Sequence, residues 1–172
     1  MELLIATLLL GIVMVGIASV DYAANQVQLK SSRSAILAMR TSATLLDISK
    51  NAGPVMGDQN NSGVSGNCFR QDLNATPTPS IYTDDSWICY TIVSNAVYKC
   101  TRASAGACTS ADENIGAATA LAVSYAGDRT LGTQNSYIDI SITNVSIPTV
   151  AVSQENPQLT LTTRVVPAFQ SY

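Results

Sequence analysis

The side chains that most often carry enzyme chemistry are scarce in this chain. It contains no histidine, which excludes histidine proton relays, Ser-His-Asp and Cys-His triads and the usual zinc sites. The acidic pairs Asp84-Asp85 and Asp112-Glu113 remain. Paired carboxylates in loops are more often solvated than bound to calcium, so we predict no metal site. Because these pairs are the main candidates for catalytic groups, we also predict no cofactor and no enzyme activity.

Four cysteines form the other reactive group: Cys68, Cys89, Cys100 and Cys108. Their spacing contains no Cys-x-x-Cys, which favours disulfides made in an oxidising compartment over a metal site. Of the three pairings we favour Cys68–Cys89 with Cys100–Cys108, because the second pair would close the short loop TRASAGA and the first would hold a long irregular segment. A Cys89–Cys100 bridge across a hairpin and four free buried thiols are the alternatives.

One acidic residue stands directly before a long apolar run. Glu2 precedes LLIATLLLGIVMVGIASV, from Leu3 to Val20, which has neither a charge nor a proline. At ~1.5 Å rise per residue this run nearly matches a hydrocarbon core of ~30 Å, so it predicts a membrane-spanning helix. Because no basic residue precedes Lys30, the run is unlike a cleavable signal peptide, and we expect it to stay in the mature protein.

The composition narrows the class of protein further. Of the 172 residues, 12% are charged and 47% are hydrophobic, which argues against a disordered chain and favours one domain with a sizeable core. From residue 51 onward nine acidic residues outnumber five basic ones, so no nucleic-acid partner is inferred.

Three asparagines stand in Asn-x-Ser/Thr sequons and are candidate glycosylation sites: Asn60, Asn74 and Asn144. Such short sequons also arise by chance.

A single long helix must position Glu2 and the apolar run. Helical spacing continues beyond Val20 in an apolar stripe of Leu29, Ile36, Met39, Ala43 and Leu46. The pattern ends at Gly53-Pro54. One helix from Leu3 to Asn51 would be roughly 70 Å long, which is longer than a bilayer is thick. The second part must therefore leave the membrane, and we predict that it lays this stripe against a folded head.

Strands must position the cysteines. The Gly- and Asn-rich segment from Gly53 to Ser86 predicts a long surface loop. The runs WICYTIV and AVYKCT around Ser94-Asn95 predict a hairpin with Ile92 opposite Val97 and Cys89 opposite Cys100. Further strands are predicted at Ala120–Tyr125, Tyr137–Thr143 and Gln158–Val166. The second of these strands places Ile138, Ile140 and Ile142 on one face. The third places Leu159, Leu161 and Val165 on one face.

One helix followed by several strands is an α+β order, without the βαβ alternation of nucleotide-binding folds. We divide the chain into a hydrophobic transmembrane or filament-core helix segment (1–20), an amphipathic helix that continues into the head (21–52) and a disulfide-bearing β-rich globular head (53–172).

The motif ELLIA with its apolar run, the single long helix and the disulfide-bearing head together resemble the type IV pilin superfamily, which includes pilins and the pseudopilins of type II secretion. The motif lies in the N-terminal helix, and the head is similar only in the order of its elements. The resemblance implies a pilin-like fold, a long helix packed on an antiparallel sheet. It also implies that Glu2 pairs with the N-terminal amine of a neighbouring subunit.

The function implied by the resemblance is structural. The chain would be a subunit of a type IV pilus-like filament, with assembly residues Glu2, Leu3, Leu4, Gly11 and Gly16. Its partners would be identical or related pilin subunits in a helical homopolymer, the pilus or secretion assembly machinery, and the bacterial inner membrane before assembly. The product would be an extracellular filament or a periplasmic pseudopilus.

Two alternatives stay open. The chain could be a minor pilin or pseudopilin of a type II secretion or competence system. It could also be a monomeric, membrane-anchored binding module.

Overall fold

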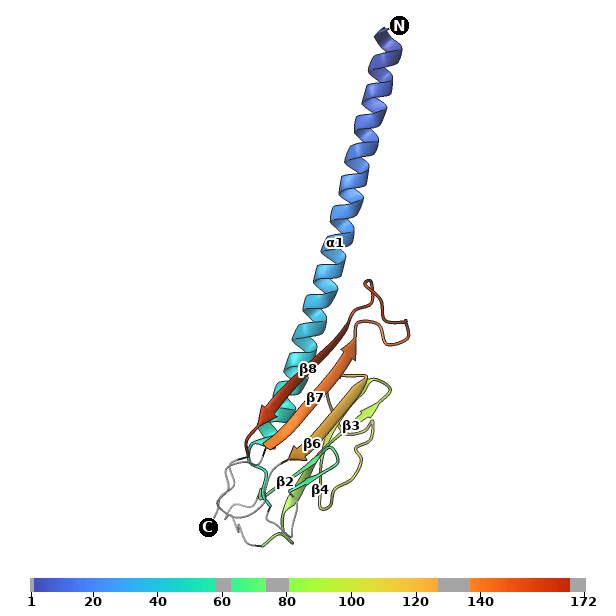
Figure 1. Ribbon diagram of the computed structural model, residues 1–172. Coiled ribbons are helices and arrows are strands. Elements are labelled where there is room, and N and C mark those ends of the chain that lie inside the picture. The colour runs from blue at the N-terminus through green and yellow to red at the C-terminus, as the bar shows by residue number, and fades with distance from the viewer. Residues whose placement is uncertain (1, 58–62, 74–80, 127–136, 168–172) are drawn as a thin grey trace. The chain divides into compact units, whose positions relative to one another are not determined.

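The computed structural model describes residues 2–57, 63–73, 81–126 and 137–167, except for the side chains of residues 2–4. One helix is followed by strands, which confirms the α+β order (Figure 1). The elements are α1 (Glu2–Ala52), β1 (Val64–Ser65), β2 (Cys68–Gln71), β3 (Ser86–Val93), β4 (Ala96–Arg102), β5 (Glu113–Ala117), β6 (Ala120–Ala126), β7 (Tyr137–Val145) and β8 (Gln158–Val165).

The chain divides into two compact units, Met1–Ile36 and Leu37–Tyr172. The described part of the first unit is helical throughout, and the second unit contains the end of α1 together with all the strands. We call the second unit the head unit. It begins inside the helix, rather than at residue 53, because residues 37–52 of α1 contribute to its core.

The helix ends where the sequence predicts. Neither glycine nor proline interrupts it after Gly16, and the backbone amide of Gly53 donates to the carbonyl of Ser49 at 3.2 Å. Pro54 then lacks the amide hydrogen that a further turn would need. Lys50 lies in the last turn, where a positive charge interacts favourably with the exposed carbonyl groups.

The strands form a five-stranded sheet, in the order β1-β2-β3-β4-β5, and a three-stranded sheet, β6-β7-β8, and all neighbours are antiparallel. The predicted hairpin is confirmed as β3 and β4, with Ile92 opposite Val97. Its turn residues, Ser94 and Asn95, have φ values of 50° and 64°, which a two-residue type I′ turn requires. The three later strand predictions are confirmed as β6, β7 and β8.

The prediction of a loop throughout Gly53–Ser86 is wrong. This segment contains β1 and β2, and all four residues of β2 are buried. β2 pairs with β3, so that Phe69 lies opposite Ile88. The sequence of β2, CFRQ, has no alternation of apolar and polar residues, and only its pairing with β3 makes it a strand. Strand β5 was not predicted either.

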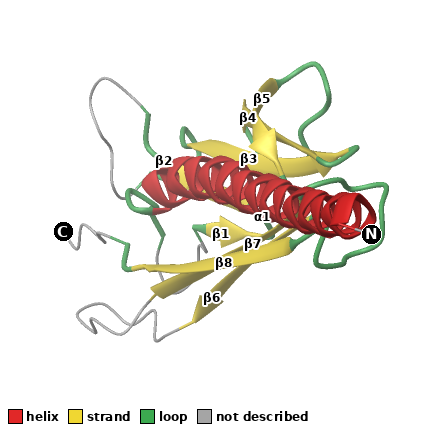
Figure 2. Ribbon diagram, turned by 90° about the horizontal axis from the view of Figure 1, so that it is seen from above, coloured by secondary structure: helices red, strands yellow, loops and turns green. Residues whose placement is uncertain are grey.

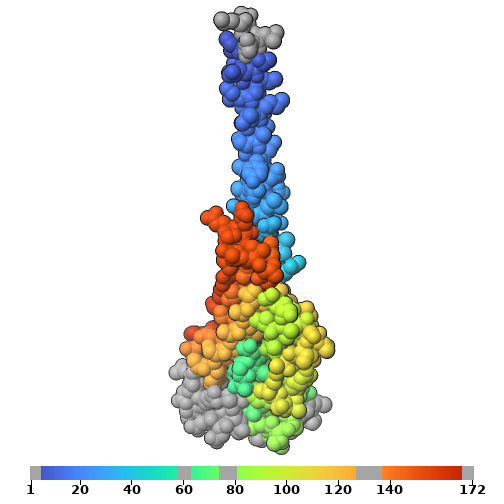
Figure 3. Space-filling view, turned by 90° about the vertical axis from the view of Figure 1, so that its right-hand side faces the viewer, coloured from blue at the N-terminus to red at the C-terminus, as the bar shows by residue number. Residues whose placement is uncertain are grey.

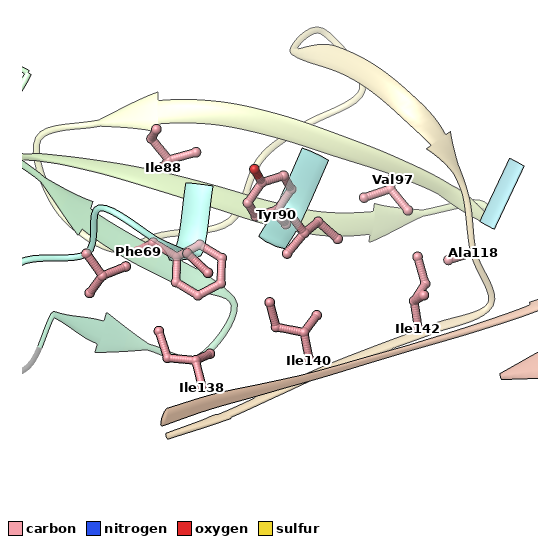
Figure 4. Packing of buried hydrophobic residues seen from close by; sticks show 11 residues of the cluster. Phe69, Ile88, Tyr90, Val97, Ala118, Ile138, Ile140 and Ile142 are labelled. Atoms are coloured by element: carbon pink, nitrogen blue, oxygen red, sulfur yellow. The ribbon is translucent and has the colours of Figure 1, made fainter. Parts of the chain in front are cut away.

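The core of the head unit lies between the two sheets and the end of α1. Ile138, Ile140 and Ile142 are fully buried on one face of β7, as predicted, and they point toward residues of the other sheet (Figure 4). The strands β3, β4 and β5 lie on one side of the end of α1 and β6, β7 and β8 on the other (Figure 2). Ile48 and Ala52 of the helix belong to this core and fill the space between the sheets.

Candidate assembly and attachment surfaces

The described part of the first unit is a single helix, which is apolar up to Val20 and mixed in composition after it. From Ile5 to Val20 its large hydrophobic side chains are between 56% and 71% exposed, and no other part of the chain covers this stretch in the view of Figure 3. α1 is long and apolar enough to cross a membrane, by length and composition, and it is a candidate membrane anchor or signal. Exposed apolar area of this extent is unfavourable in water, so it must be covered by lipid or by other helices.

The predicted assembly residues lie along this helix. Glu2, Leu3 and Leu4 belong to the first turn of α1, and their side chains lie outside the described part of the structure. At Gly11 and Gly16 a methyl group would enter open space. The Ser19 hydroxyl donates to the Gly16 carbonyl at 2.8 Å, within the helix itself. Gly11 and Gly16 thus have open space beside them for contact with another chain.

The predicted packing of the helix stripe on the head is wrong. Met39 and Leu46 are 73% and 69% exposed, and Ile36 is 48% exposed. The helix instead buries a different face, made of Leu37, Thr41, Thr44, Ile48 and Ala52. The larger apolar residues at positions 36–46 therefore lie mainly on the face that the head unit leaves uncovered.

Two threonines explain why the buried face escaped the prediction. The hydroxyl of Thr41 donates to the Leu37 carbonyl at 2.7 Å, and that of Thr44 donates to the Arg40 carbonyl at 3.0 Å. These bonds satisfy the hydroxyl groups inside the helix, so both residues can be buried at little cost. Asn144 of β7 also donates its side-chain amide to Thr41 Oγ1 at 3.4 Å.

A polar network fastens the end of the helix to the five-stranded sheet. The Tyr90 hydroxyl donates to Asp47 Oδ2 at 3.0 Å and accepts from Asn51 Nδ2 at 2.8 Å. Lys99 Nζ lies 3.3 Å from Asp47 Oδ1. Burial, reinforced by the Asp47 carboxylate, raises the pKa of Tyr90 well above its usual range, so the phenol stays neutral and donates. The network positions the helix within the head unit.

The structure pairs Cys68 with Cys89 and Cys100 with Cys108, which is the pairing that we favoured. Cys89 lies opposite both Cys68 and Cys100 in the sheet, so the alternative Cys89–Cys100 bridge was compatible with the register. The two disulfides lie together, with Trp87 and Tyr98 packed against them. Disulfides indicate an oxidising environment, extracellular or periplasmic.

Of the two acidic pairs, Asp112 alone belongs to a group of metal-ligating atoms among the described residues. Asp112 lies near the sulfur atoms of Cys100 and Cys108, but these sulfurs are bonded to each other. Asp112 accepts from the Thr109 backbone amide at 2.7 Å and from Arg102 at 2.7 Å. These interactions, the first one most strongly, hold the pKa of Asp112 below its ordinary value. The carboxylate therefore stabilises the loop that the second disulfide closes.

Asp85 and Arg70 form a buried ion pair, with Asp85 Oδ2 3.6 Å from Arg70 Nε. The Arg70 guanidinium also lies over the rings of Tyr82 and Trp87, 4.2 Å and 5.6 Å from their centres. A basic group in the middle of this cluster disfavours a cation there. Asp84, the neighbour of Asp85, is exposed.

The candidate glycosylation site at Asn144 is wrong. Only 3% of this residue is exposed, and its Nδ2 donates to the Ala117 carbonyl at 2.8 Å. A glycan cannot be accommodated at a buried amide in the folded protein. Asn60 and Asn74 lie outside the described residues.

An apolar loop that was not predicted connects β7 and β8, at residues 146–157. It exposes Ile147, Val150 and Val152, by 38%, 49% and 56%. A signal was present, because Pro148 and Pro157 mark this segment as a connection, and apolar residues are unusual in a surface connection.

No family model, curated protein or solved structure matches this chain.

Proposed function

We propose that the protein is a structural subunit of a type IV pilus-like filament and that it assembles through its apolar N-terminal helix. It is stored in the inner membrane with residues 3–20 in the bilayer. On assembly the same residues leave the lipid and pack against the helices of other subunits, and the head lies on the filament surface.

The observation that carries this proposal is the exposed apolar helix that continues into a disulfide-bonded head. An anchor needs apolar side chains only while it lies in lipid. Here, however, the exposed apolar surface extends past Val20 to Leu46, well beyond the length that a bilayer covers. Neighbouring subunits would supply an apolar cover along this whole length, which supports a filament more than a simple anchor.

Glu2 gives the assembly its direction in this proposal. A carboxylate among packed helices is costly unless a positive group neutralises it, and the N-terminal amine of an adjacent chain supplies that charge. The pairing then favours one register between neighbouring helices.

The direct test is to shear surface material from the source cells, image it by cryo-electron microscopy and identify its subunits by intact mass. Filaments made mainly of this chain would support the proposal. Glu2→Gln, which keeps the side-chain shape and removes the charge, is expected to lower the yield of filaments. Glu113→Gln, at an exposed position of β5, is the control and should assemble like the parent.

An anchored binding module makes a different prediction. If residues 3–20 were exchanged for an unrelated membrane span and the protein kept its cellular role, the helix would be only an anchor and the filament proposal would be wrong. A chain that occurs in filaments only in trace amounts would favour the minor pilin or pseudopilin.

A further inference from the structure

The head unit leaves one helix face uncovered. We call Met39, Ala43 and Leu46 the outer helix face; all three are exposed, and they lie on one side of α1. They lie on the helix turns that bury Thr41, Thr44 and Ile48 on the other side. Two large apolar side chains, both more than two-thirds exposed, make this face unusual for a surface helix of a folded head.

The loop between β7 and β8 is the second uncovered apolar surface of the head unit. We call Ile147, Val150 and Val152 the loop tip. The loop is held in one conformation by Asn156, which is 2% exposed. Its Oδ1 accepts from the Ile147 amide at 2.7 Å, and its Nδ2 donates to the carbonyls of Ile147 and Val150 at 3.0 Å and 2.7 Å.

This internal support distinguishes the loop tip from an incidental apolar surface. A buried asparagine that holds the loop's backbone on both sides of its turn reduces the entropy that the loop would lose on binding. The loop therefore presents three apolar side chains to solvent in a preorganised form.

The charges beside the two surfaces are complementary. The loop segment 146–157 has one charged residue, Glu155. Arg40 lies three residues before Ala43 and Lys50 four residues after Leu46, and both are exposed. Asp47, four residues after Ala43, is paired with Lys99. The charge beside the outer helix face is therefore mainly positive. An acidic loop and a basic helix border on the same chain favour contact between two copies.

We propose that the loop tip of one copy packs on the outer helix face of the next copy. This inference rests on the proposed function, and it names the contact that the head units make outside the apolar bundle of N-terminal helices. Because the two surfaces differ, the contact is heterologous, and each added copy leaves one free loop tip and one free helix face. Such a contact repeats without closing, as a filament requires.

Cysteine cross-linking between two differently marked chains tests the contact. A chain with Val150→Cys and a tagged chain with Leu46→Cys are expressed together, filaments are sheared off, and the thiols are oxidised. The control replaces the first chain by one with Thr162→Cys, an exposed position on the outward face of β8. We expect tagged heterodimers with Val150→Cys at least about tenfold above the control, with both native disulfides intact by peptide mass mapping.

A second measurement separates packing from folding. The double change of Val150 and Val152 to Ser is expected to lower the filament yield about tenfold, as the loss of some 1.4 kcal/mol per contact would. The melting temperature of the chain in detergent should change little, because both side chains are about half exposed.

The outcomes are distinguishable. Filaments of this chain that give no heterodimer above the control overturn the loop–helix contact and leave the filament proposal intact. Cross-links from Val150→Cys to a different protein overturn the choice of a second copy. If the parent chain forms no filaments at all, both proposals fail.

Discussion

Gly116 lies where β5 passes close to the helix. The register between β4 and β5 shifts at Val97 and Tyr98, and Gly116 has a φ of +156°, a value that other residues rarely adopt. A Cβ atom at this position would collide with the side chain of Thr44 on the buried helix face. The close packing of sheet and helix here requires glycine.

We therefore expect Gly116→Ala to lower the free energy of unfolding by more than about 2 kcal/mol, from backbone strain and overpacking together. Gly66→Ala is the matched control, since Gly66 has a φ of +55° but open space around its Cβ position. It should cost about 1 kcal/mol, the backbone strain alone. Chemical unfolding of the full chain in detergent, followed by circular dichroism, measures both; equal losses would contradict the helix contact.

The burial of Asp85 predicts that the free energy of unfolding depends on pH. Only 6% of this residue is exposed, and neither carboxylate oxygen accepts a hydrogen bond among the described residues. Burial raises the pKa of Asp85 above its ordinary 3.8, against the opposing effect of Arg70. Between pH 3.8 and the raised native pKa, the Asp85 carboxyl is therefore still protonated in the native state but ionised in the unfolded chain. The stabilising contribution is complete below pH 3.8 and is lost as the pH rises through the native pKa.

We expect the parent to lose more stability than Asp85→Asn when the pH is raised from about 3 to about 6, because the amide does not titrate. Thr83→Ala, at an exposed neighbouring position that carries no charge, should keep the pH profile of the parent. Denaturation midpoints across this range provide the measurement. Parallel profiles for the parent and Asp85→Asn would show that the carboxyl has an ordinary pKa.

At the scale of the element, α1 has two apolar faces in the head unit, one buried in the core and one exposed. Ile48 is fully buried in the core of the head unit, whereas Leu46, two residues earlier, is 69% exposed. Truncating a buried isoleucine removes apolar burial and leaves a cavity, whereas truncating an exposed leucine removes neither.

Ile48→Ala is expected to lower the free energy of unfolding by about 2–5 kcal/mol, and Leu46→Ala to change it by less than about 0.5 kcal/mol. Both variants keep a residue of high helix propensity, so the comparison isolates packing. Urea unfolding of the two chains in the same detergent decides the matter. A large loss for Leu46→Ala would mean that the outer helix face is packed within its own chain.

At the scale of the whole molecule, the head unit folds around its own core, while the apolar part of the first unit needs a surrounding that the chain does not supply. Two disulfides stabilise the head unit and indicate an oxidising environment, extracellular or periplasmic. The long helix α1 is a candidate membrane-spanning segment.

Leu10→Lys tests the membrane assignment. A charge in the middle of the apolar run costs about 3 kcal/mol on insertion, so the variant should be extracted from membranes by alkaline carbonate while the parent stays in the pellet. Leu46→Lys introduces the same charge in the head unit and should leave the chain in the pellet. Retention of Leu10→Lys would argue against a spanning helix.

Local patterns determined much of this protein. The single helix and its end at Gly53-Pro54, the β3–β4 hairpin and its register, and three later strands all follow from periodicity and turn residues over short windows. Cysteine spacing and the predicted strands were also sufficient to favour the observed disulfide pairing. These features depend on neighbours in the sequence, which is why the sequence contains them.

Tertiary contacts decided the rest. β2 is a strand because β3 supplies its hydrogen-bond partners, and Asn144 is buried because Thr41 and Ala117 surround its amide. The helix can pack a face with two threonines against the sheets because the hydroxyls of Thr41 and Thr44 form hydrogen bonds within the helix. The larger apolar residues, Met39 and Leu46, lie on the exposed face. Periodicity shows that a helix has an apolar face; only the three-dimensional arrangement shows whether its own head or another molecule covers that face.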